Sequence, residues 1–118
     1  MEKVSGKLTI KIFEMKHPNR DGYCIILVDN LQKLKTKQRS KGTINEELSL
    51  KVENASEVEI AYFDKHDTLL SLLFFKLGPI SKASEYLKGV NDEFEMESTG
   101  TIHLLIQFGT FFRTSLSS

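Results

Sequence analysis

The stretch from Glu57 to Leu77, EVEIAYFDKHDTLLSLLFFKL, constrains the fold of this chain more than any other segment. In its first half Val58, Ile60 and Tyr62 alternate with glutamates and a small alanine, which is the period-two pattern of a strand with one buried face. Its second half, 69–77, is apolar almost throughout, so we expect partners over both of its faces or a place in the core of two layers. The polar loop between the halves carries Asp64, His66 and Asp67.

Strand patterns recur along the rest of the chain, separated by turn-forming residues every 8 to 12 positions. Expected strands are Gly6–Phe13, Tyr23–Val28, Leu31–Lys37, a run containing Leu48, Leu50 and Val52, a short run containing Phe94 and Met96, and a last run containing Ile102, Leu104, Ile106 and Phe108. Between 80 and 88 the pattern allows one or two helical turns, with Ser81 as the N-cap and Gly89 as the stop. The sequence therefore predicts an all-β protein, an eight-stranded antiparallel β-sandwich.

Length and charge narrow the functional classes. A chain of 118 residues is about one domain, and we divide it into a lead (1–5), the domain proper (6–109) and a tail or start of a linker (110–118). Its 16 basic and 16 acidic side chains cancel, which argues against a dedicated nucleic-acid binder. Any attraction for an anionic partner must therefore come from a local patch.

The lone cysteine and the absence of long apolar runs bear on location. Cys24 has no partner for an internal disulfide and lies in an apolar run, so we expect a small buried side chain and a reducing, cytoplasmic setting. No apolar run approaches the roughly 20 residues that span a bilayer, and the start lacks the apolar region of a signal peptide. We expect a soluble chain that is at most peripheral at membranes.

The order of motifs resembles the C2 domain family. The motifs are GKLTIKI at 6–12, DGY at 21–23, KLKTK at 33–37, NEEL at 45–48 and YFDK at 62–65. Gly22 stands where the family usually has proline, and Ile44 where it usually has tryptophan. The likeness covers 6–108, nearly the whole chain, and implies a C2 sandwich.

A narrower likeness concerns VEIA at 58–61, LLFFKL at 72–77 and FEMESTGTI at 94–102. These are similar to the C2 region of protein kinase N and of fungal protein kinase C, and the order of strands is similar to the type II arrangement of the family. The resemblance implies a regulatory domain of a larger serine/threonine kinase or a stand-alone relative.

Calcium-dependent members of the family use about five loop aspartates, which suits a cation that takes 6–8 oxygen ligands. Here Asp21 and Asp64 match two of these positions, His66 replaces a third, and Asp67 falls near a further one. The first loop has cationic side chains where another ligand is usual. We therefore expect no calcium site. A zinc site from His17, His66, Asp64 and Asp67 remains an alternative, although two solvated loops explain the same residues.

The lysine-rich strand is the stronger functional hypothesis. Lys33, Lys35 and Lys37 alternate at a spacing of about 7 Å, and Arg39 and Lys41 extend the charge into the next loop. In the C2 family such a face can bind anionic headgroups, notably phosphatidylinositol bisphosphate. The competing explanation is that the lysines protect an exposed strand against edge pairing.

Catalysis finds no support in the sequence. His103 is expected opposite the apolar face of Ile102 and Leu104, with no nucleophile or second base beside it. We therefore expect a non-catalytic, calcium-independent module without a cofactor. Its partner is an anionic phospholipid or phosphoinositide. The alternative is a protein-interaction or autoinhibitory module that packs on a kinase domain or another protein.

Overall fold

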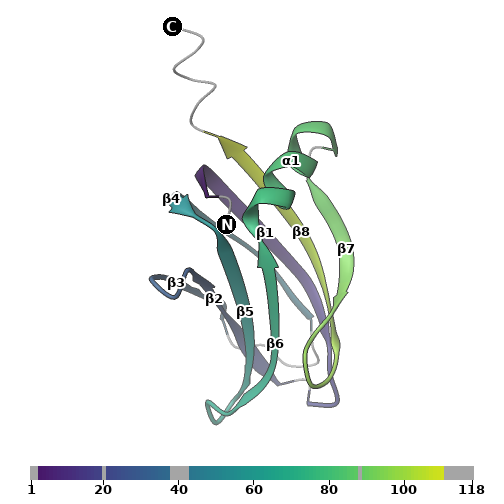
Figure 1. Cartoon of the computed structure of the whole chain (residues 1–118). Coiled ribbons are helices and arrows are strands. Elements are labelled where there is room, and N and C mark those ends of the chain that lie inside the picture. The colour runs from purple at the N-terminus through teal and green to yellow at the C-terminus, as the bar shows by residue number, and fades with distance from the viewer. Residues whose placement is uncertain (1–2, 20, 38–42, 88, 111–118) are drawn as a thin grey trace, which may run out of the picture.

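The chain folds into two packed β-sheets with one helix at their side (Figure 1). The computed structural model describes residues 3–19, 21–37, 43–87 and 89–110. The elements in this part are β1 (Val4–Lys16), β2 (Gly22–Val28), β3 (Gln32–Lys35), β4 (Thr43–Ala55), β5 (Glu57–Asp64), β6 (Leu69–Lys76), α1 (Leu77–Leu87), β7 (Val90–Glu95) and β8 (Thr101–Thr110).

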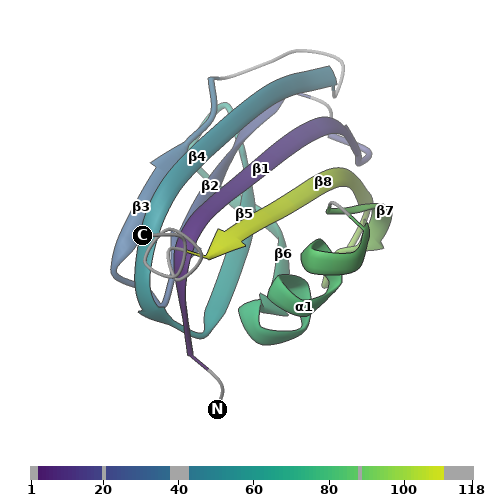
Figure 2. The same ribbon diagram turned by 90° about the horizontal axis from the view of Figure 1, so that it is seen from above.

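Each sheet has four strands, and every neighbouring pair is antiparallel. Sheet I has the order β4-β1-β8-β7, and sheet II has the order β3-β2-β5-β6. The first and last strands, β1 and β8, therefore lie side by side in sheet I (Figure 2). The predicted eight-stranded antiparallel sandwich is confirmed.

The core lies between the two sheets and takes one face of each strand. On β1 the inward residues Leu8, Ile10 and Ile12 are buried, while Lys7 remains exposed on the other face, as the alternation predicts. On β5, Val58, Ile60 and Tyr62 are buried in the same way. The polar side chains of β1 thus lie on the face that is turned away from the core.

Gly22 is required by the close approach of β2 and β5. A Cβ atom at this position would lie 2.2 Å from the carbonyl oxygen of Phe63, far inside van der Waals contact. Proline, the usual residue of the C2 pattern here, also carries a Cβ atom. Glycine at position 22, in place of the usual proline, therefore fits the close packing of β2 against β5.

The prediction that both faces of 69–77 are covered is wrong. β6 is the edge strand of sheet II, and only one of its faces enters the core. Leu73 is 9% exposed, whereas Leu69 and Phe74 are 48% and 44% exposed. The run is apolar on both faces, but the described residues cover only the inner one.

The helix is longer than the sequence predicted. It begins at Leu77, not near Ser81, so Ser81 lies inside it and is not the N-cap. Pro79 fits in the first turn, because the N–H groups there have no partner within the helix. Gly89, with φ at +129°, follows the helix and ends it as predicted.

Strand β3 is shorter than the expected Leu31–Lys37, because Leu31 belongs to the turn after β2. The backbone N–H of Leu31 donates to the carbonyl of Val28 at 2.9 Å, and Asp29 and Asn30 between them have positive φ. Arg39, Lys41, Phe111 and Phe112 lie outside the described residues.

Candidate functional site

Lys35 of β3 lies on the outer face of sheet II. Lys35 pairs in register with Ile25 of β2, and Lys33 pairs with Leu27. Between them and Lys37, Leu34 is partly buried against the core and Thr36 is buried. The predicted alternation is thus present.

Thr36 fixes this register beyond the end of β3. Its backbone N–H donates to the carbonyl of Cys24 at 2.9 Å, and its Oγ1 accepts the backbone N–H of Cys24 at 2.8 Å. Both bonds hold the chain against β2. The exposed Lys37 therefore follows Lys35 at a defined place, not on a free loop.

Lys35 rests on an aromatic pair. Its Nζ lies 4.3 Å from the ring centroid of Tyr23, which stacks on Phe63 at 5.5 Å between centroids. A cation over an aromatic face is attracted by the ring quadrupole, which restricts where the charge lies. The ammonium group stays exposed and available to an anion.

A carboxylate lies near the end of this lysine row. The backbone N–H of Lys37 faces the Oε2 of Glu46 on β4 at 3.2 Å. The Glu46 carboxylate thus accepts a hydrogen bond from the backbone of Lys37, and a negative group lies at the end of the lysine row.

The loop after β5 is closed by its own aspartate. The Oδ1 of Asp64 accepts the backbone N–H groups of His66 at 2.8 Å and of Thr68 at 2.9 Å. These bonds, the one from Thr68 first, lower the pKa of Asp64 below its ordinary value. The carboxylate that matches a calcium position thus closes a turn.

Further residues of these loops form hydrogen bonds within the chain. The hydroxyl of Tyr23 donates to Asp67 at 2.5 Å, and this bond raises the pKa of Tyr23. The backbone N–H of Asp21 donates to the Oδ1 of Asn19 at 3.1 Å, and the Nδ1 of His17 accepts the N–H of Asn19 at 2.9 Å. Across the described ranges, no three His, Cys, Asp or Glu side chains gather as metal ligands would.

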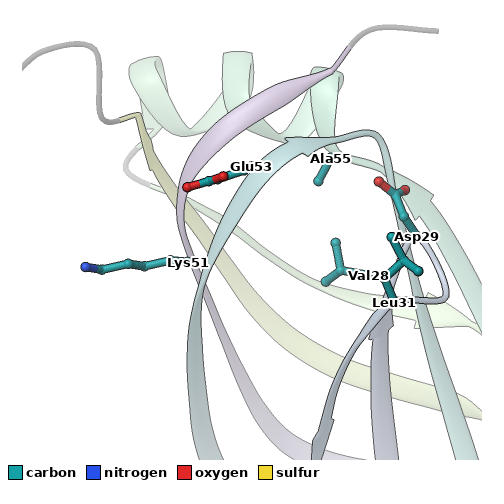
Figure 3. A pocket seen from close by; sticks show the side chains of 6 residues that line it. All are labelled: Val28, Asp29, Leu31, Lys51, Glu53 and Ala55. Carbon is teal, nitrogen blue, oxygen red and sulfur yellow. The ribbon is translucent and has the colours of Figure 1, made fainter.

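A pocket of about 270 Å³ opens between the β2–β3 turn and β4 (Figure 3). It is lined by Val28, Asp29, Leu31, Lys51, Glu53 and Ala55. Asp29 accepts the backbone N–H groups of Ser56 and Glu57 at 3.1 and 2.9 Å, as well as the Ser56 hydroxyl at 3.1 Å. Asp29 therefore joins the β2–β3 turn to the turn between β4 and β5. Spacing along the chain does not show this role, because the partners of Asp29 are about 27 residues away.

The surroundings of His103 and Cys24 give neither side chain a catalytic partner among the described residues. The Nε2 of His103 lies 2.7 Å from the Oδ1 of Asn91, and its ring lies 4.5 Å from that of Phe13 on the outer face of sheet I. Cys24 is fully buried, which raises the pKa of its thiol to about 12. A buried thiol of that kind is a poor nucleophile.

Solved structures share this arrangement of strands. The fold superposes on extended synaptotagmin 2 with a TM-score of 0.73 at 17% identity, over 89% of this chain, in a structure that spans the SMP domain and both C2 domains of that protein. A second structure, of the two C2 domains alone, gives a TM-score of 0.69 at 24% identity over 93% of this chain. A further C2 domain gives 0.62 at 15% identity, with 89% of this chain and 99% of that domain covered. The chain has a C2 fold.

These likenesses establish the C2 fold and no more. The chain spans 28% and 43% of the two extended-synaptotagmin chains, so it corresponds to one domain of each. The sequence matches no family model and no curated protein. No helix among the described residues is both long and apolar enough to cross a bilayer.

Proposed function

We propose that this C2 domain is a non-catalytic targeting module that attaches weakly to anionic membrane lipid through Lys33, Lys35 and Lys37. The observation that carries the proposal is the placement of Lys35, which is exposed and held over Tyr23 on the outer face of sheet II. Lys37 is also exposed, and Lys33 belongs to the proposal through the alternation in the sequence. Arg39 and Lys41 follow in the chain and belong to the proposal on sequence alone.

Electrostatics sets the expected strength of this contact. A basic side chain near an anionic leaflet contributes about 1 kcal/mol, and the effect decays within a Debye length of about 8 Å at physiological salt. Three to five such cations support a reversible attachment. Binding of this kind weakens steeply as salt rises.

Calcium independence is part of the proposal. Its support is the use of the loop carboxylates as hydrogen-bond acceptors: Asp64 for two backbone N–H groups, and Asp67 for the Tyr23 hydroxyl. A cation that needs 6–8 oxygen ligands would have to displace these bonds. The kinase setting implied by the sequence resemblance also belongs to the proposal.

Vesicle sedimentation tests lipid binding. We expect the chain to sediment with phosphatidylcholine vesicles that contain phosphatidylinositol bisphosphate, but not with phosphatidylcholine alone. Changing Lys33, Lys35 and Lys37 to glutamine should abolish sedimentation. The control changes Lys3, Lys7 and Lys11 to glutamine, which removes the same charge elsewhere on the domain. No binding at low salt, or equal loss in both variants, would refute the proposal.

A thermal melt tests calcium independence. A ligand that binds only the folded state raises the midpoint of unfolding. We expect equal midpoints in excess Ca²⁺ and in chelator. A clear rise with Ca²⁺ would show that the loop carboxylates exchange their protein partners for the ion.

A further inference from the structure

The outer face of sheet II is apolar across three strands. Strand pairing places its outward residues in three rows: Leu27, Glu59 and Phe74; Ile25, Ala61 and Leu72; and Tyr23, Phe63 and Leu69. Eight of these nine side chains are apolar or aromatic. In an antiparallel sheet whose outer face meets water, polar residues are expected at such positions.

This face is exposed in part: Leu69 and Phe74 are 48% and 44% exposed, whereas Ala61 is 3% exposed and Tyr23, under the ammonium group of Lys35, is 5% exposed. The helix α1 packs mainly on β8 of sheet I, with smaller contacts to β7 and β1, and both ribbon views place it near those strands (Figures 1 and 2). A hollow of about 210 Å³ lies on the face, lined by Ile25, Leu27, Glu59, Ala61, Phe63, Leu69 and Leu72. The small Ala61 is at the centre of the rows, with larger side chains around it.

The dimensions of the apolar area match an α-helix. Three strands about 4.8 Å apart give a width of about 10 Å between the outer two, close to the 10–12 Å diameter of a helix with its side chains. Three rows about 7 Å apart give a length of about 14 Å, which some nine helical residues cover at 1.5 Å each. One helix of two to three turns, laid along the strands, would cover the area.

The charges beside the area favour one kind of helix. Lys35 lies next to Ile25 in register, and the exposed Lys37 follows it after the buried Thr36, so a basic row borders the apolar area beside β2. These lysines repeat every 7 Å or so, and residues i and i+4 of a helix repeat about every 6 Å. Acidic side chains at that spacing on one flank of the helix would meet the lysines.

Two other occupants fit less well. A flat bilayer surface would leave the hollow beside Ala61 unfilled, and it would press Glu59 against anionic headgroups. A second copy of the chain would present the same concave face, with its own hollow opposite this one. A convex, amphipathic element fills the hollow and leaves Glu59 at the end of the area.

We propose that the outer face of β2, β5 and β6 docks an amphipathic α-helix of a protein partner, whose apolar side chains fill the hollow beside Ala61 and whose acidic flank pairs with Lys35 and Lys37. The inference goes beyond lipid attachment and does not rest on it. Because the proposed lipid contact uses Lys35 and Lys37 as well, a docked helix and an anionic membrane would compete for the domain.

The test uses the full chain and a designed probe. The probe is an acetylated and amidated peptide of about 18 residues, long enough to be helical in water. It carries leucines on one face and glutamates along one flank, and a matched peptide carries lysines in place of the glutamates. In fluorescence anisotropy at low salt we expect the glutamate peptide to bind at least about tenfold more tightly than the lysine peptide, because the flank charge meets lysines.

Substitutions on the face separate docking from lipid binding. The double variant Leu69→Ser and Phe74→Ser should weaken the glutamate peptide at least about tenfold and leave vesicle sedimentation unchanged. Both side chains are about half exposed, so the fold should persist, which a thermal melt checks. Leu31→Ser is the matched control, since Leu31 is 86% exposed and lies in the β2–β3 turn, off this face.

Any of these results would overturn the inference: equal binding of the two peptides, no binding of either, unchanged binding in the double variant, or a dimer of the wild type that the double variant dissociates. A loss of vesicle binding in the double variant would identify the bilayer as the occupant and also overturn it. Peptide binding without vesicle binding would refute only the lipid proposal. Vesicle binding without peptide binding would refute only the helix.

Discussion

The outer faces of the two sheets differ although their inner faces are alike. On sheet I, cross-strand neighbours are polar: the hydroxyls of Thr9 and Ser49 lie 3.1 Å apart, and Lys11 pairs in register with Glu47. On sheet II the equivalent row joins Ile25, Ala61 and Leu72. The row on sheet II is thus apolar where these pairs on sheet I are polar.

Charge is distributed differently as well. On sheet I, Lys16 forms an ion pair with Glu93 at 2.7 Å, and the hydrogen bond and charge of this pair lower the pKa of Glu93. On sheet II, Lys35 lies at the β3 edge beside the apolar rows, with its ammonium group over the Tyr23 ring. The Lys16 ammonium group of sheet I thus has a carboxylate partner, whereas the Lys35 ammonium group of sheet II lies over an aromatic ring.

The largest expected effects test whether the inner faces really are equivalent. Ile10 of sheet I is 1% exposed and Ile60 of sheet II is 0% exposed. Changing either to alanine should lower the free energy of unfolding by about 2–5 kcal/mol, from lost apolar burial and the cavity left behind. Urea unfolding followed by circular dichroism measures both. A much smaller cost in one sheet would mean that the sheets differ inside as well as outside.

A smaller effect is expected on the outer face of sheet II. Phe74→Ser should cost about 1 kcal/mol or less, since roughly half of the side chain stays in water and full burial of phenylalanine contributes about 1.5–3 kcal/mol. The same urea titration checks this value. A cost as large as that of Ile60→Ala would mean that Phe74 is packed within the folded chain, and the face would then not be open.

The acid side of the stability profile tests the loop at the end of the apolar rows. Since the folded pKa of Asp64 is lowered, its contribution is fully present above the unfolded value of about 3.9 and is lost as the pH falls through the lower folded pKa. Asp64→Asn should therefore lower the melting temperature at pH 7, and the difference from the wild type should shrink toward pH 2. Glu95→Gln, on sheet I, is the control. A difference that stays constant over this range would contradict the assignment.

The smallest effect is expected for the ion pair of sheet I. Both Lys16 and Glu93 are more than half exposed, so solvent and salt screen the pair. Lys16→Gln should leave the melting temperature almost unchanged at physiological salt, with any difference visible only at low ionic strength. A clear loss at high salt would show that sheet I depends on its outer charges more than exposure suggests.

The alternation of apolar and polar residues predicted the strands of the sandwich, because the buried face of a strand is encoded in neighbouring residues. Val58, Ile60 and Tyr62 are buried as their spacing indicated. The apolar run 69–77 misled because its composition is apolar on both faces, whereas burial depends on which other segments pack there, and Leu69 and Phe74 stay about half exposed.

The candidate site was predictable in part. The lysine alternation is visible in the sequence, and the structure adds the Tyr23 ring beneath Lys35. That contact, like the bonds from Ser56 and Glu57 to Asp29, joins residues of different strands or turns. The tertiary fold creates such pairs, and spacing along the chain carries no signal of them.

The environment of Tyr23 gives the domain a built-in optical reporter. The chain has three tyrosines and no tryptophan, so its near-ultraviolet emission comes from tyrosine alone. Tyr23 contacts Lys35 through its ring, Phe63 by stacking and Asp67 through its hydroxyl. An anion at Lys35, a helix over Phe63 or an ion at Asp67 would each alter that emission. Unlabelled protein can therefore be titrated with all three classes of ligand.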